Sequence, residues 1–333
     1  MIDAMRVLIL GGSEFVGRAF VDDALARGWH VTTLNRQTHP APPGVVSLRG
    51  NRWEADGLTE LRGGSWDVVV DTWSWAPVAV RDAARLLADK ARSYVYVSSR
   101  SVYVSPTPAG ADESAPIVDS YPDLTEADYS QAKAGGELAA IESFGDRAIL
   151  LRAGLILGPH ENIGRLPWWL SRIERGGAVL APGVPSGGIQ YIDARDLAAF
   201  GLDAAASNLG GAFDIVSPVG FATLGDLLGE CVEVVGSDAR LEWVDQERVL
   251  AAGIEPWSHL PVWLPEGELH ASLHESNVSK AIDAGLRVRP VHTTVGDTWR
   301  WLQSLGGDAP QREDRPRLGL DPTVEASVLA QPR

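Results

Sequence analysis

The stretch Val7-Leu-Ile-Leu-Gly-Gly-Ser-Glu-Phe-Val-Gly17 decides the fold of this 333-residue chain. Its first four residues are apolar without alternation, which predicts a strand buried on both faces, as in a parallel sheet. Gly11 and Gly12 suit a tight turn, and Gly17 allows a following helix to pack closely. A strand, glycine turn and helix of this kind aim backbone N–H groups at the pyrophosphate of a dinucleotide. The residues of this expected dinucleotide site are Gly11, Gly12, Ser13, Phe15, Val16 and Gly17.

Two positions near this turn refine the expectation. Glu14 occupies the place of the middle glycine in G-x-G-x-x-G. A carboxylate beside a diphosphate would repel it, so we expect Glu14 to point to solvent. The second strand ends in Leu34-Asn35-Arg36, without the acid that binds the ribose hydroxyls in NAD sites. Because a guanidinium pairs with a 2′-phosphate, Asn35 and Arg36 predict that NADP(H) is preferred, with NAD(H) also accepted.

Strands and helices alternate over the first half of the chain. Strands are predicted over 7–10, 30–34, 45–48, 66–70, 94–97 and 148–151, with helices over 16–27, 77–91 and 128–144. This order predicts an α/β fold, a Rossmann-type doubly wound parallel sheet with a smaller α+β substrate domain built from C-terminal insertions. We expect a dinucleotide-binding domain over 1–155 and 189–216, and a substrate domain over 156–188 and 217–333.

The second half of the chain is less regular. We expect helices over 168–175 and 193–206, a strand over 212–216, and a surface linker over 306–316. A last short helix is predicted to begin at Asp321-Pro322, because Asp caps a helix and Pro suits its first turn.

Composition excludes several classes of protein. Hydrophobic residues make up 45% and charged residues 22%, which are ordinary globular values. Lys and Arg number 29 against 44 Asp and Glu, a net charge of −15 that argues against nucleic acid as a partner. The lone Cys231 forms no internal disulfide, and the histidines lack zinc-like spacing, so no metal is expected. No apolar run reaches the roughly 18 residues of a membrane span, and no signal peptide is recognisable. We expect a cytoplasmic protein.

Tyr129-Ser-Gln-Ala-Lys133 places a tyrosine and a lysine on one face of the predicted helix. A nearby ammonium stabilises a phenolate and suits it to proton transfer near neutral pH. Ser99, at the end of the predicted fifth strand, would donate a hydrogen bond to a substrate oxygen. Tyr129, Lys133 and Ser99 are therefore the candidate catalytic residues.

Taken together, these stretches resemble an extended short-chain dehydrogenase/reductase of the NAD-dependent epimerase/dehydratase family, over nearly the whole chain. The glycine turn with Phe15, and Gly50-Asn-Arg52, are similar to the atypical branch of that family. The other stretches that carry the resemblance are Tyr94-Val-Tyr-Val-Ser-Ser-Arg-Ser-Val-Tyr103, Tyr129 to Lys133 with Glu137, Leu151-Arg-Ala-Gly-Leu-Ile-Leu-Gly-Pro159 and Gln190-Tyr-Ile-Asp-Ala-Arg-Asp-Leu-Ala198.

The resemblance implies roles for these residues. Tyr129 would be the general acid/base and Lys133 its tuner, with both also contacting the cofactor. Ser99 would bind the substrate oxygen. Further cofactor contacts are implied for Asn51, Arg52, Trp73, Ser98, Ala153, Leu155 and Ile156. A homodimer through the helices that begin near Pro77 and Tyr129 is the candidate assembly, and the oligomeric state stays open.

The departures from the family bear on the reaction. Ser99-Arg-Ser101 replaces the Thr-Asp-Glu of the dehydratases. Ile189 stands where nucleotide-sugar epimerases carry an Arg, and Ala153-Gly154 where they often carry an Asn. These positions favour a simple NADP-dependent reductase or dehydrogenase acting on a carbonyl, imine or alcohol carbon. A nucleotide-sugar epimerase is the alternative, and a non-catalytic NADP-binding sensor the second one.

The substrate side is expected between the two domains, at the carboxyl ends of the strands. Most of the twelve Trp would pack the smaller domain, and the remainder would wall a site for a planar or hydrophobic small molecule. Arg165 would pair with an acidic group of the substrate or form a surface salt bridge. The candidate substrate residues are Trp75, Ser99, Arg165, Trp168 and Trp169, and further candidates are Trp257, Trp263 and His259.

Overall fold

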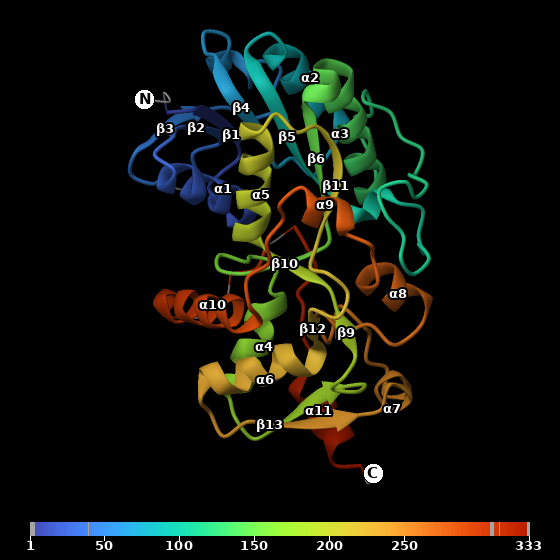
Figure 1. The fold of residues 1–333 in the computed structure, drawn as a ribbon. Helices are drawn as coiled ribbons and strands as arrows, with labels where there is room; N and C mark the ends of the chain where they lie inside the picture. Colours follow the sequence, from blue (N-terminus) through green and yellow to red (C-terminus); the bar gives the residue numbers. More distant parts are fainter. Residues whose placement is uncertain (1–3, 39, 307–309, 313, 332–333) are drawn as a thin grey trace.

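The computed structural model describes residues 4–38, 40–306, 310–312 and 314–331. A seven-stranded parallel sheet occupies one half of the molecule, in the order β11-β6-β5-β4-β1-β2-β3 (Figure 1). Its strands are β1 (Arg6–Leu10), β2 (His30–Asn35), β3 (Val45–Arg49), β4 (Trp66–Asp71), β5 (Ala91–Ser99), β6 (Ala148–Ala153) and β11 (Gly211–Ile215). The predicted doubly wound Rossmann-type sheet is confirmed.

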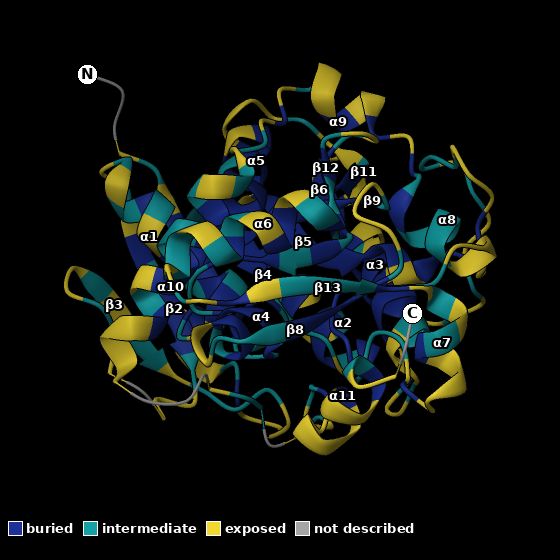
Figure 2. Cartoon of the chain, turned by 90° about the horizontal axis from the view of Figure 1, so that it is seen from below, coloured by how far each residue is buried: buried dark blue, intermediate teal, exposed yellow. Residues whose placement is uncertain are grey.

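Helices cover both faces of this sheet, because its strands are apolar on both sides. Helices α1 (Phe15–Ala26) and α5 (Ala194–Ala206) pack on one face, and α2 (Pro77–Leu87) and α3 (Tyr129–Phe144) on the other. The inner strands β1, β4 and β5 are mostly buried and the edge strand β3 is partly exposed, while the covering helices alternate between buried and exposed positions (Figure 2). Three short 3-10 helices, over Thr59–Leu61, Arg100–Val102 and Gly145–Arg147, complete this half.

The other half holds a separate hydrophobic core. Its main helices are α4 (Arg165–Glu174), α6 (Leu224–Val235) and α10 (Val291–Leu305), which pack together in that core. Three two-stranded pairs accompany them: β7 (Leu155–Leu157) with β10 (Tyr191–Asp193), β8 (Ala178–Pro182) with β13 (Arg240–Val244), and β9 (Gly188–Ile189) with β12 (Ala222–Thr223). The remaining helices are α7 (Gln246–Ala251), α8 (Glu268–His274), α9 (Ser279–Asp283) and α11 (Pro322–Leu329).

Several element boundaries of the second half match their predictions and others do not. Helix α11 begins after Asp321, whose carboxylate caps it as expected. Helix α4 starts at Arg165, three residues before the predicted start. Ala281 and Leu286, expected in the substrate domain, belong to the core beside α1 and α5. None of the helices that the structure describes has the length and apolar character that crossing a bilayer requires.

Candidate functional site

The glycine turn after β1 has the geometry that a dinucleotide requires. Gly11 and Gly12 adopt φ angles of +117° and +95°, which favour glycine strongly over other residues. A Cβ atom on Gly17 would lie 2.6 Å from the Gly12 nitrogen, so only glycine lets α1 pack this closely against the turn. Helix α1 begins at Phe15, directly after the turn. This close approach of turn and helix fits a bound pyrophosphate.

Glu14 is exposed, as predicted, and the structure shows where its carboxylate goes. Its Oε2 accepts a 2.7 Å hydrogen bond from the side-chain amide of Asn162, which lies in the loop between β7 and α4. This bond directs the carboxylate toward the second half of the molecule, and it ties the glycine turn to that loop.

The residues predicted around the adenosine fall into two groups. Arg36 is exposed just beyond β2. Asn35 accepts a hydrogen bond from the Gln37 backbone, and Asn51 donates one to Glu54 on the same side of the sheet. Both amides lie at the surface near the glycine turn, consistent with an adenosine site.

Arg52 is placed differently from the prediction. Its guanidinium is buried and donates to both carboxylate oxygens of Asp71, at 2.6 and 2.9 Å, and to the Ala79 carbonyl oxygen at 2.6 Å. It also stacks on the ring of Trp73, 4.8 Å from the ring centroid. These contacts hold the Arg52 guanidinium inside the fold and engage it with protein partners. Its role is to fasten the loop after β3 to the end of β4.

Helix α3 begins at Tyr129, directly after Asp128, whose carboxylate accepts a 2.9 Å hydrogen bond from the Gln131 N–H. This cap fixes the first turn of the helix. The Tyr129 side chain is 43% exposed, whereas Lys133, one turn later, is 2% exposed. The helix thus presents a phenol to the solvent side and an amine to the protein.

Lys133 is held by backbone oxygen atoms. Its Nζ donates to the carbonyl oxygens of Val97 at 2.6 Å and Trp73 at 2.7 Å, and it lies 4.9 Å from the Tyr96 ring centroid. Burial lowers the pKa of Lys133 to about 7, and the nearby Asp71 carboxylate opposes that shift. An ammonium has three donors, so the third is left for a cofactor or substrate.

The two serines at the end of β5 have different surroundings. Ser98 is buried and donates a 2.6 Å hydrogen bond to Glu137, which forms a 2.7 Å ion pair with Arg152. Ser98 was expected to contact the cofactor, but its hydroxyl is engaged in this internal network. Ser99 accepts a hydrogen bond from the Ser101 N–H at 3.1 Å. The Ser99 hydroxyl donates a 3.2 Å hydrogen bond to the Ser101 hydroxyl, a weaker partner than the Glu137 carboxylate that holds Ser98. Ser99 is therefore the better candidate of the two for a substrate-oxygen donor.

The expected nicotinamide side lies where β6 leads into β7. Ala153 ends β6, next to Ser99 in the sheet register, and Leu155 and Ile156 begin β7. Ala153 and Leu155 are buried, and Ile156 is half-buried. Ala153 therefore lies beside the end of β5, whereas Leu155 and Ile156 pair with β10.

The tryptophans predicted on the substrate side are not equivalent. Trp75 is 41% exposed. Trp169 is completely buried, and its Nε1 donates a 2.7 Å hydrogen bond to the Pro261 carbonyl oxygen. Trp168 stacks edge-on against it, 4.7 Å between centroids, and Trp263 is also buried. Trp169 and Trp263 therefore belong to the core, and the prediction of a substrate contact for Trp169 is wrong for this reason.

The segment made of residues 310–312 and 314–320, which we call the C-terminal strap, was not predicted to be part of the site. It overlaps the surface linker predicted over 306–316, of which residues 307–309 and 313 lie outside the described residues. In the structure the Arg312 N–H donates to the Asn162 carbonyl oxygen at 2.9 Å. The Arg315 guanidinium carbon lies 5.8 Å from the centroid of the Tyr129 ring. The strap therefore runs beside Tyr129, the candidate acid/base, and no sequence signal indicated this.

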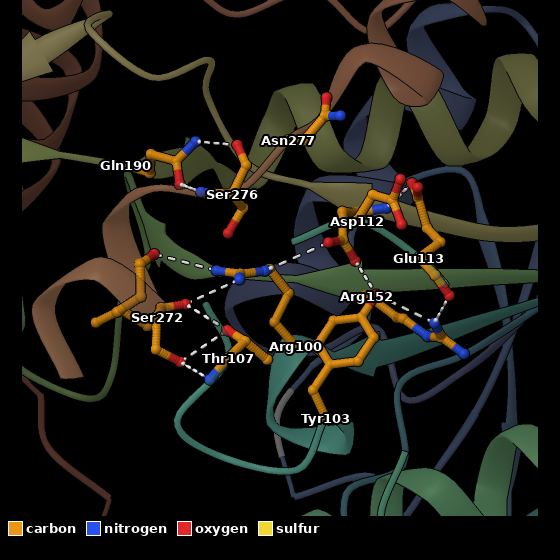
Figure 3. A network of polar contacts seen from close by, with 12 residues as sticks. Arg100, Tyr103, Thr107, Asp112, Glu113, Arg152, Gln190, Ser272, Ser276 and Asn277 are labelled. Atoms are coloured by element: carbon orange, nitrogen blue, oxygen red, sulfur yellow. Dashed lines mark hydrogen bonds and ion pairs between the residues drawn. The ribbon is translucent and has the colours of Figure 1, made fainter. Parts of the chain in front are cut away.

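A polar network joins the two halves next to the site (Figure 3). Arg100, directly after Ser99, donates to the carbonyl oxygens of Ser272 at 2.9 Å and Leu273 at 3.1 Å, at the end of α8. Asp214 on β11 lies 3.5 Å from the same guanidinium. Arg100 stands at the place in the sequence where the dehydratases carry an acid. Its guanidinium binds the end of α8 and lies beside β11, so it links the two halves of the molecule.

Comparison with known proteins identifies the fold of this chain. No family model and no curated protein matches the chain. Among solved structures, the Bordetella bronchiseptica enzyme WbmH in complex with NAD+ is 17% identical, with a TM-score of 0.68 over 90% of this chain and 99% of that one. A putative epimerase from Burkholderia cenocepacia is 18% identical, with a TM-score of 0.67 over 90% and 98% of the two chains. UDP-N-acetylglucosamine 4-epimerase from Bacillus cereus is 15% identical, with a TM-score of 0.66 over 90% and 100%.

The chain therefore shares its fold with these three solved structures. The likeness spans the Rossmann half and the smaller half together, because it covers about nine-tenths of the chain. Among the described residues, no group of three or more His, Cys, Asp and Glu side chains is placed to hold a metal ion.

Proposed function

We propose that this protein is an NAD(P)-dependent enzyme that exchanges a hydride with a carbinol or carbonyl carbon of a small molecule. The observation that carries the proposal is the position of Tyr129: an exposed phenol, one helical turn from the buried amine of Lys133. Tyr129 lies at the same edge of the sheet as the glycine turn and Ser99. A proton-transfer group and a dinucleotide site therefore share one edge.

The residues that would hold the cofactor follow from this geometry. The glycine turn and the first turn of α1 would hold the pyrophosphate, and Lys133 would donate its third hydrogen to the nicotinamide ribose. Arg36, exposed beyond β2, is placed to pair with a 2′-phosphate, which supports a preference for NADP(H). A bound nicotinamide supplies the hydride acceptor or donor. The protein side chains then supply proton transfer and orientation.

Tyr129 and Ser99 would both contact the substrate oxygen, the first to transfer its proton and the second to orient it. In the oxidation direction the Tyr129 phenolate accepts the proton of the substrate hydroxyl, and in reduction the phenol returns it. The Ser99 hydroxyl donates a hydrogen bond to the same oxygen and orients it.

The comparisons favour an epimerase outcome of this chemistry over the reductase that the sequence favoured. Three of the similar solved structures are nucleotide-sugar 4-epimerases by name. In an epimerase the hydride returns to the opposite face of the same substrate, so the cofactor is not consumed.

A reductase is the second candidate, because Ala153-Gly154 and Ile189 depart from the nucleotide-sugar pattern. The two outcomes separate cleanly in one experiment. In one assay the purified protein is incubated with UDP-sugars and a catalytic amount of NAD(P)+. In a second assay it is incubated with a panel of ketones and imines and a stoichiometric amount of NADPH or NADH. Formation of the epimeric sugar without net change at 340 nm supports an epimerase, and net cofactor oxidation supports a reductase. Tight cofactor binding without turnover of any substrate would contradict both and favour a sensor.

We also propose a homodimer through α2 and α3. These two helices pack side by side on one face of the sheet, and Leu138 and Ile141 of α3 are 41% and 46% exposed. Sedimentation velocity of the wild type and of Ile141→Glu tests the proposal. A monomeric wild type would overturn it.

A further inference from the structure

Three arginines from two distant segments gather around Tyr129. Arg315 of the C-terminal strap stacks on the Tyr129 ring, at 5.8 Å from its centroid. Arg312 of the same strap lies 5.9 Å from the centroid of the exposed Trp75 ring. Arg165, at the start of α4, lies 5.4 Å from the Trp257 ring centroid. Gly164 and Gln311 are in contact, which places the strap against the start of α4.

The charges of these arginines are incompletely balanced by protein carboxylates. Arg312 forms a 2.6 Å ion pair with Asp314. Arg315 forms no ion pair within the described residues, and the buried Nε of Arg165 has no hydrogen-bond partner there. Glu161 is the acid beside Arg165. Its two carboxylate oxygens accept hydrogen bonds from the backbone N–H groups of Arg165 and Leu166, at 2.7 and 3.2 Å.

Electrostatics between these groups supports an external anion. Burial lowers the pKa of Arg165, Glu161 opposes the shift, and the Arg315 cation adds to it. Two guanidinium groups that disfavour each other's charge are stabilised together when one anion lies between them. A donor left unpaired in a buried place costs free energy that a ligand would recover.

We propose that Arg165 and Arg315, with Arg312 at the rim, form an anion subsite beside Tyr129. It would hold the phosphate or carboxylate group of the substrate, and the C-terminal strap is the wall that closes it. Assigning this anion to the substrate rests on the proposed function, whereas anion binding itself does not. The strap thereby selects acidic substrates, even though the whole protein carries a net charge of −15.

Binding of two simple anions tests the subsite and distinguishes its sources. The protein is first saturated with cofactor, so that the glycine turn is occupied. Inorganic pyrophosphate and citrate are then titrated separately, with tryptophan fluorescence and calorimetry as readouts, since Trp75 and Trp257 lie beside Arg312 and Arg165. We expect at least one anion to bind, pyrophosphate if the substrate group is a phosphate and citrate if it is a carboxylate.

Variants locate the binding. Arg315→Gln and Arg165→Gln should each weaken the preferred anion at least tenfold, and Arg315→Lys should weaken it less. Arg317→Gln is the matched control, because Arg317 is an exposed strap residue two positions from Arg315. Equal affinity in wild type and Arg315→Gln, or no binding of either anion by the wild type, would overturn the proposal. Circular dichroism and thermal unfolding show that each variant is folded.

A separate result would show that the proposed enzyme function is wrong while the anion subsite exists. Tyr129→Phe should bind the anion as the wild type does, because the phenol oxygen is not part of the subsite. Anion binding that depends on Arg315, in a protein that turns over no substrate, would leave the subsite intact and contradict the enzyme proposal alone.

Discussion

The amine of Lys133 on α3 donates a 2.7 Å hydrogen bond to the carbonyl oxygen of Trp73, in the loop after β4. A second bond, of 2.6 Å, runs to the Val97 carbonyl oxygen on β5. Two strand ends thereby determine where the amine lies, and the helix places Tyr129 one turn away. The relation between phenol and amine is thus set by the sheet and not by the helix alone.

Tyr129→Phe removes only the phenol oxygen from this arrangement. We expect turnover to fall by about 10²–10⁴-fold, the usual contribution of a positioned acid/base group. Cofactor affinity should change little, because the Lys133 contacts persist. Steady-state kinetics on the substrate found by the panel above, with cofactor titration by fluorescence, measures both. Full turnover in a variant that still binds cofactor would reject Tyr129 as the acid/base.

Arg36→Ala tests the predicted preference for NADP(H). Loss of a charge-assisted pair to the 2′-phosphate should weaken NADPH by roughly tenfold, since such bonds contribute about 1.5–3 kcal/mol. NADH affinity should stay nearly constant. Arg49→Ala, at an exposed arginine that ends β3, is the control. Equal affinities for NADPH and NADH in the wild type would contradict the preference.

The buried pair between Glu137 and Arg152 predicts a large effect on stability. Glu137→Ala leaves the Arg152 guanidinium buried without its carboxylate, and the free energy of unfolding should fall by about 3–5 kcal/mol. The double variant Glu137→Leu/Arg152→Met removes both charges and should recover much of that loss. Urea unfolding measures each protein. Equal stability of the single and double variants would show that charge burial is not the cause.

Glu161 predicts a pH dependence of stability. Burial raises the pKa of Glu161 to about 7, although Arg165 and two backbone N–H groups oppose the shift. The folded state therefore keeps a proton that the unfolded state releases near pH ~4.3. Its contribution to stability is complete below that pH and is lost as the pH rises through about 7. The shift is equivalent to about 4 kcal/mol.

Glu161→Gln removes this titration while keeping a similar shape. Its melting temperature relative to the wild type should rise between pH 5 and pH 8, measured by calorimetry at each pH. Asp214, whose pKa burial raises to about 6, adds the same sign of dependence to both proteins. The difference between them therefore isolates Glu161. A constant difference across this range would contradict the assignment.

Much of the fold was predictable because its signals are local. The apolar run from Val7 to Leu10, the glycines behind it and the spacing of Tyr129 and Lys133 each follow from neighbours in the chain. The misplaced residues have non-local partners. Arg52 is buried because Asp71, nineteen positions later, binds it. Trp169 is buried because its indole bonds to Pro261, ninety-two positions away.

The sequence by itself determined the Rossmann-type sheet and the position of the glycine turn, and it indicated Tyr129, Lys133 and Ser99 as the candidate catalytic residues. Hydrophobic periodicity and glycine conformations act over a few residues, so they can be recognised without a structure. Only the tertiary structure decided that the C-terminal strap lies beside Tyr129 and brings Arg315 to its ring. That contact joins residues 186 positions apart, and it depends on the packing of α4 and α11, which no local pattern records.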